Sequence, residues 1–218
     1  MEPYPGDASD YEPIHPRGTD WRGILRKIWA PIAVVVGLAI KFGVAFAKFA
    51  SIFVAVGGYA LIWGWRFAIG LVLLILVHEM GHYLEARRQG LHPSLPVFIP
   101  FLGAYVAIKG AGLNPWRHAL IALAGPVTGA LGALAVLVAA DVKDSDFLSA
   151  LAYTGFLLNL FNLIPIGFLD GGQIARSIGY LRRGGAPGRA YTVGVAYVAL
   201  ALLLVAGMVA THVGQHRL

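Results

Sequence analysis

Two histidines and a glutamate inside a strongly apolar stretch are the residues most suited to chemistry. The stretch LVHEMGHYLEARRQG, residues 76–90, holds His78, Glu79 and His82 in the spacing H-E-x-x-H. On a helix, residues four apart differ by about 40° around the axis, so the two imidazoles point to one place. Neutral imidazoles are good Zn²⁺ ligands, and Glu79 on the adjacent flank can take a proton from a water activated by the metal. The spacing therefore predicts a zinc site with a catalytic glutamate.

A catalytic zinc site needs a third protein ligand and keeps one position open. Glu85 is expected to pair with the arginines that follow it, and the aspartates of residues 141–146 are expected in a solvated loop. Asp170 remains as the expected ligand, with Gly171 allowing the backbone to approach the metal closely. In the alternative interpretation, Asp170 is the N-cap of a helix that starts at Gly171.

The composition indicates that these residues sit in a membrane protein. Of 218 residues, 58% are hydrophobic and 13% are charged, whereas a soluble domain is typically about a quarter charged. The net charge of +6 comes from short basic clusters between apolar runs, which is typical of the flanks of membrane spans and not of a nucleic-acid interface. The chain has no cysteine, which excludes disulfides and thiolate metal sites.

The apolar runs predict an all-α integral membrane protein, a polytopic helix bundle of about five or six transmembrane segments. Residues 1–27 are rich in proline and acids and are expected to form a flexible soluble tail before a membrane domain at 28–218. The first apolar run is either a span or an interfacial helix. The expected segments are residues 28–49, 50–65, 67–86, 117–140, 147–164 and 191–210.

The stretch LHPSLPVFIPFLGAYVAIKG, residues 91–110, is expected to be non-helical. Three prolines forbid a continuous helix, while its β-branched and aromatic residues favour extended structure. Non-helical backbone at membrane depth must be enclosed by protein or line a watery cavity. We therefore expect a re-entrant loop or short β-hairpin beside the histidines, and its residues 97–108 could receive an extended substrate by strand addition.

HEMGH together with NLIPIGFLDGG resembles the site-2 protease family of intramembrane zinc metalloproteases. The second motif of that family has the form N-x-x-P-x-x-x-x-D-G, which Asn162, Pro165, Asp170 and Gly171 match. The resemblance covers about residues 66–185, the expected catalytic core. Members often carry a PDZ or CBS module, for which this sequence shows no stretch.

The resemblance implies a role for each matching residue. His78, His82 and Asp170 would bind zinc. Glu79 would be the catalytic glutamate, and Asn162 would steady the substrate carbonyl or its oxyanion, a role that suits an amide donor. Asn159, one turn earlier, could share that role, but we expect it to be a polar residue in helix packing.

The expected function is hydrolysis of a peptide bond within or near a transmembrane segment of another membrane protein, with the lipid bilayer as surroundings and no nucleic acid as partner. Two alternatives are a metal-ion transporter with the same ligands and a catalytically silent binding protein of the same fold. A transporter would commonly show repeated, interrupted segments, and no second histidine motif is present.

The positions of the charges predict the orientation. The positive-inside rule places Arg87, Arg88, Lys109, Arg117 and residues 176–189 in the cytoplasm and the acidic loop outside. We therefore expect a protein of a prokaryotic cell membrane whose active site opens toward the cytoplasm.

Overall fold

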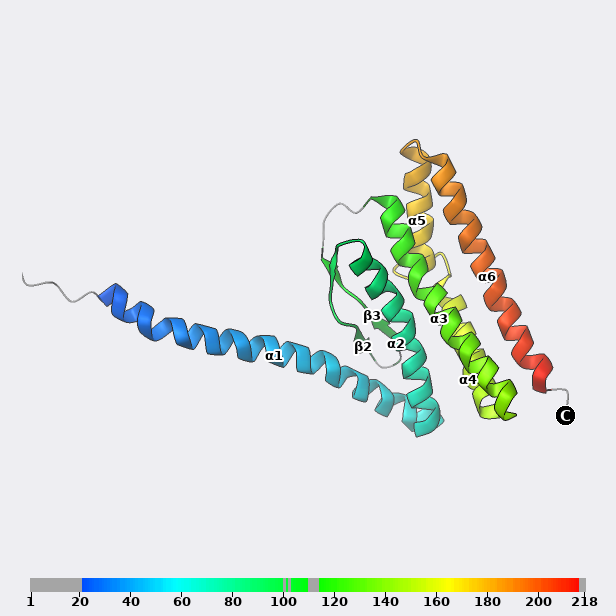
Figure 1. Cartoon of the computed structure of the whole chain (residues 1–218), viewed down its shortest axis with the longest axis horizontal. Helices are drawn as coiled ribbons and strands as arrows, with labels where there is room; N and C mark the ends of the chain where they lie inside the picture. Colours follow the sequence, from blue (N-terminus) through cyan, green and yellow to red (C-terminus); the bar gives the residue numbers. More distant parts are fainter. Residues whose placement is uncertain (1–20, 100, 102, 110–113, 216–218) are drawn as a thin grey trace, which may run out of the picture. The chain divides into compact units, whose positions relative to one another are not determined.

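The computed structural model describes residues 21–99, 101, 103–109 and 114–215, which form six helices and four short strands (Figure 1). Residues 1–20 of the predicted tail lie outside the described residues, and residues 21–27 form the first turns of a helix. The chain divides into two compact units, Met1–Ala45 and Phe46–Leu218. Within the first unit, the described residues are all helical.

The first helix, α1, runs without interruption from Trp21 to Trp63. The prediction of two separate segments at 28–49 and 50–65 was therefore wrong. The break falls at Gly64, whose φ of 80° is open to glycine without steric cost. Helix α2 (Trp65–Arg88) begins at the next residue and includes Arg66, the residue between the expected segments 50–65 and 67–86. A charged side chain leaves the backbone hydrogen bonds intact, whereas a positive φ interrupts them.

The remaining helices pack around α3 (Pro115–Lys143), which contacts α2, α4 (Asp146–Asn162), α5 (Asp170–Arg183) and α6 (Pro187–Gln215). By length and composition, four helical segments among the described residues can cross a membrane. The segments are Val36–Trp63, Trp65–Arg88, Pro115–Lys143 and Pro187–Thr211. Helix α4 was counted among the expected spans, but with 17 residues it is not one of these four segments. The predicted class, a polytopic all-α membrane protein, is confirmed.

A hairpin follows α2, as predicted. Strands β2 (Val97–Ile99) and β3 (Gly103–Tyr105) are antiparallel, with Phe98 opposite Ala104, and β1 (His92–Pro93) pairs with β4 (Ile108–Lys109). The Phe98 side chain is buried in a cluster formed largely by α2, and its N–H donates to Ser51 Oγ of α1 at 3.0 Å. These contacts hold the hairpin against the helix that carries both histidines.

Two apolar clusters form the interior of the second unit. One joins α3, α4, α5 and α6 around the buried side chains of Phe156, Ile174 and Leu204. The other cluster joins the C-terminal part of α1 to α2, to β2 and to one residue of α4, Leu151. Large apolar side chains also cover the outside of the long helices, among them Leu202 and Leu203. A water-soluble protein rarely exposes so continuous an apolar surface, so lipid is its natural surrounding.

Candidate metal centre

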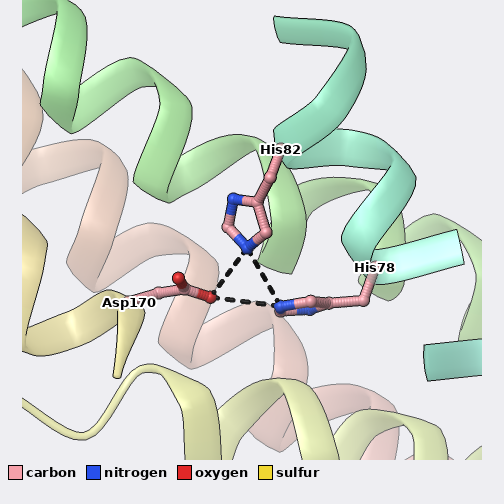
Figure 2. Close-up of side chains that lie close together, drawn as sticks. All are labelled: His78, His82 and Asp170. Carbon is pink, nitrogen blue, oxygen red and sulfur yellow. Dashed lines mark hydrogen bonds and ion pairs between the residues drawn. The ribbon is translucent and has the colours of Figure 1, made fainter. Parts of the chain in front are cut away.

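Side chains from two distant parts of the chain meet at one point (Figure 2). Asp170 Oδ2 lies 3.1 Å from His78 Nε2 and 3.3 Å from His82 Nε2, and the two Nε2 atoms are 3.2 Å apart. The histidines lie one turn apart on α2, and Asp170 is the first residue of α5. The structure therefore brings together the three residues that the sequence suggested as ligands.

The start of α5 removes the alternative interpretation of Asp170. The helix begins at Asp170 itself, and its N-cap residue is Leu169, so Asp170 does not cap a helix that starts at Gly171. The glycine has a different use from the one expected. A Cβ at Gly171 would lie 2.0 Å from the Leu163 carbonyl oxygen, so the absent side chain lets α5 close against the end of α4.

In each imidazole, Nδ1 lies within hydrogen-bonding distance of an oxygen, while Nε2 faces Asp170. His78 Nδ1 lies 2.8 Å from Asn159 Oδ1 of α4, and His82 Nδ1 lies 2.8 Å from the Ile121 carbonyl oxygen of α3. Both acceptors are oxygens, so each Nδ1 donates its proton, and in a neutral ring Nε2 then presents a lone pair. Hydrogen bonds from the second nitrogen are the usual way in which proteins orient metal-binding histidines.

Two glycines of α3 make room for this arrangement. A Cβ at Gly125 would lie 2.2 Å from His82 Nε2, and a Cβ at Gly129 would lie 2.0 Å from Asn159 Oδ1. Both glycines lie in a stretch of small residues, LAGPVTGALGALA, residues 123–135. Here the close contact is between the backbone of α3 and the side chains of the metal centre.

The geometry fits a tetrahedral metal ion. With metal–ligand distances of about 2.0–2.1 Å, the ligand atoms of a tetrahedral zinc site lie about 3.3 Å apart, and the three separations here are 3.1, 3.2 and 3.3 Å. Asp170 Oδ2 is buried and accepts no hydrogen bond from the described residues. Two lone pairs and a carboxylate facing one another are unfavourable unless a cation lies between them. Two nitrogens and one oxygen suit Zn²⁺.

Glu79 and Asn162 lie near this centre in the chain, but the structure shows no hydrogen bond from either side chain to the other described residues. Glu79 follows His78 on α2 and is 6% exposed. Asn162 is the last residue of α4, one turn beyond Asn159, and is partly exposed. Their catalytic roles therefore remain predictions.

The predicted pairing of Glu85 is confirmed, because its carboxylate accepts two hydrogen bonds from Arg88, at 2.7 and 2.8 Å. Asn159 was expected to have only a packing role, but its side chain contacts His78. A polar residue within an apolar membrane helix was the available signal. The Ile121 carbonyl that holds His82 has no signal in the sequence, because every residue has a backbone carbonyl.

Comparison with known proteins identifies the family. The profile of Peptidase family M50 matches residues 66–144 and 138–206, which include both motifs. The chain belongs to Peptidase family M50. The predicted membership of the site-2 protease family is thereby confirmed.

Three relatives show how far the similarity extends. "Putative zinc metalloprotease Rip3" of Mycobacterium tuberculosis is 34% identical over 141 residues, covering 59% of this chain and 36% of that protein. "Putative zinc metalloprotease sll0528" of Synechocystis is 29% identical over 152 residues, covering 66% and 39%. "Zinc metalloprotease MJ0392" of Methanocaldococcus jannaschii is 28% identical over 160 residues, covering 68% and 46%. The chain thus spans less than half the length of each.

Proposed function

We propose that this M50 family member is an intramembrane zinc metalloprotease that hydrolyses a peptide bond within or near a transmembrane segment of another membrane protein. The observation that carries this proposal is the convergence of His78 and His82 of the apolar helix α2 with the buried Asp170 of α5, with Glu79 next to the first ligand. The names of the relatives, all zinc metalloproteases, support the same activity.

The position of the metal centre along α2 supports cleavage inside the membrane. At a rise of about 1.5 Å per residue, His78 lies about 20 Å from Trp65 and about 15 Å from Arg88. A bilayer has a hydrocarbon core about 30 Å thick. A helix that spans this core would carry the ligands well below either surface, where only a membrane-embedded peptide bond can reach them.

Each residue then has a role in hydrolysis. Zinc held by the three ligands would polarise the substrate carbonyl and acidify the attacking water. Glu79 accepts a proton from that water while the water oxygen bonds to the carbonyl carbon. Glu79 then gives the proton to the amine nitrogen as the C–N bond breaks. Asn162 donates a hydrogen bond to the oxyanion that develops on the carbonyl oxygen.

A helical substrate must unwind before its carbonyls are accessible, and the hairpin offers a surface for the extended form. The Phe98 N–H of β2 already donates to Ser51 Oγ. In an antiparallel pair this makes Phe98 and its partner Ala104 a non-hydrogen-bonded pair, so the N–H and C=O of Ala104 point away from β2. The substrate strand would therefore add to the edge of β3 that faces away from β2.

The charge distribution supports an opening toward the cytoplasm. Figure 1 shows the C-terminal ends of α2 and α5 and the N-terminal ends of α3 and α6 on one side of the bundle. The basic residues at these ends are Arg87, Arg88, Arg117, Arg182, Arg183 and Arg189. Asp141, Asp144 and Asp146 lie where α3 meets α4, on the other side. The positive-inside rule makes the basic side cytoplasmic, in what we propose is a prokaryotic cell membrane.

The test compares wild-type protein with Glu79→Gln in the same host membranes. Mass spectrometry of new peptide termini should find cleavages within or near membrane spans that only the wild type produces and that a zinc chelator abolishes. Purified Glu79→Gln should still contain about one zinc per chain, because the substituted residue is not a ligand. The same termini in membranes of the variant, or a wild-type protein without zinc affinity, would refute the proposal.

A further inference from the structure

We infer that Asn159 is a positioning residue of the metal centre, which selects the tautomer and the ring orientation of His78. The inference rests on the proposed zinc site. Asn159 is 1% exposed and lies in the last two turns of α4, an otherwise largely apolar helix. A buried amide in such a helix requires partners for both its ends. The structure supplies one partner for each end.

The backbone of α4 determines which end of the amide faces the histidine. Asn159 Nδ2 donates to the Gly155 carbonyl oxygen at 2.7 Å. Reversing the amide would place Oδ1 against that carbonyl, and two acceptors would face each other. Oδ1 is therefore the end directed at His78, 2.8 Å from Nδ1. Since Oδ1 can only accept, Nδ1 must donate.

This hydrogen bond determines how the imidazole meets the metal. A neutral imidazole carries one proton, so a protonated Nδ1 leaves the lone pair on Nε2. Nε2 is the atom that lies 3.1 Å from Asp170 Oδ2 and 3.2 Å from His82 Nε2. Without the acceptor, His78 would also populate the tautomer that carries a proton on Nε2, and this tautomer cannot bind zinc through that atom.

The two histidines differ in how this control is supplied. His82 uses the Ile121 carbonyl, a backbone group that side-chain substitutions leave in place. The partner of His78 is the side chain of Asn159. This side chain lies directly against the backbone of α3 at Gly129, where there is no space for a Cβ. A single substitution outside the three proposed ligands, at Asn159, can therefore remove the control of the His78 tautomer.

The test measures zinc affinity directly, by competition with a chromogenic chelator on purified protein in detergent. Asn159→Leu has a similar volume but no acceptor, and its zinc affinity should fall about 10- to 100-fold, the usual effect of losing an outer partner of a ligating histidine. Asn159→Asp keeps an acceptor oxygen opposite Nδ1, and a proton on its other oxygen can replace the Nδ2 donor to the Gly155 carbonyl, so it should bind zinc within about threefold of wild type, well short of that loss.

Ser177→Ala is the matched control. Ser177 is also a buried polar residue, 2% exposed, but it interacts with His118 and not with the metal centre. The substitution Ser177→Ala should lower the thermal stability of the protein without changing its zinc affinity. If Asn159→Leu does not fold, Asn159→Ala, which also removes the acceptor, takes its place in the comparison.

Three results would overturn the inference. These are wild-type zinc affinity in the variants that lack the acceptor, an equal loss in Asn159→Asp, and an equal loss in Ser177→Ala. Each leaves the proposed function standing as long as wild-type protein binds zinc and cleaves its substrates. Conversely, a wild-type protein with no zinc affinity would remove the proposed function itself.

Discussion

The substitution Gly125→Ala should disrupt the metal centre although it replaces none of the three proposed ligands. The new Cβ would lie 2.2 Å from His82 Nε2, 2.4 Å from Cε1 and 2.8 Å from Cδ2. Ordinary contacts of a Cβ are 3.4–4 Å, so the ring or α3 must move by about 1 Å or more. A zinc ligand is tolerated only within about 0.2 Å of its proper distance. The nearest atom is Nε2, the nitrogen that would bind the metal, so the displacement would disturb coordination.

We expect zinc affinity to fall by at least about 100-fold in Gly125→Ala, the upper end of the range for losing an outer partner, because here a ligand itself is displaced. The assay is chelator competition on purified protein, with thermal unfolding to show that the variant folds. Gly132→Ala is the matched control in the same helix. A Cβ there would lie 3.1 Å from Val77 Cγ1, in contact with no ligand, and zinc affinity should be retained. Wild-type affinity in Gly125→Ala would show that His82 is not confined as described.

Two further substitutions separate binding from stability. Asp170→Asn removes the only carboxylate among the three proposed ligands, so zinc affinity should drop by at least about 100-fold, and unchanged zinc affinity would contradict the assignment. Tyr197→Phe removes the hydrogen bond from Tyr197 Oη to the Leu163 carbonyl oxygen; a loss of about 1 kcal/mol should lower the melting temperature by about 2–4 °C at this chain length, and scanning calorimetry that finds no shift would show that this contact does not support the end of α4.

The sequence alone was sufficient for the class of protein and for the three candidate ligands that the structure brings together. Apolar runs and helical spacing are local properties, so they predicted a helical membrane protein and placed His78 and His82 on one face. The second motif then singled out Asp170. The hairpin after α2 was also predictable, because closely spaced prolines exclude a helix whatever surrounds them.

Other features depended on contacts between segments far apart in the chain. The continuity of α1 past residue 50 was missed, because hydropathy marks membrane depth and not the ends of a helix. The partners of the imidazoles were missed as well. Asn159 reaches His78 only because α4 packs beside α2 across a glycine of α3, and Ile121 acts through a carbonyl that every residue possesses. The residue types that can bind zinc are thus set by the sequence, whereas the packing of helices decides which nitrogen of each imidazole faces the metal.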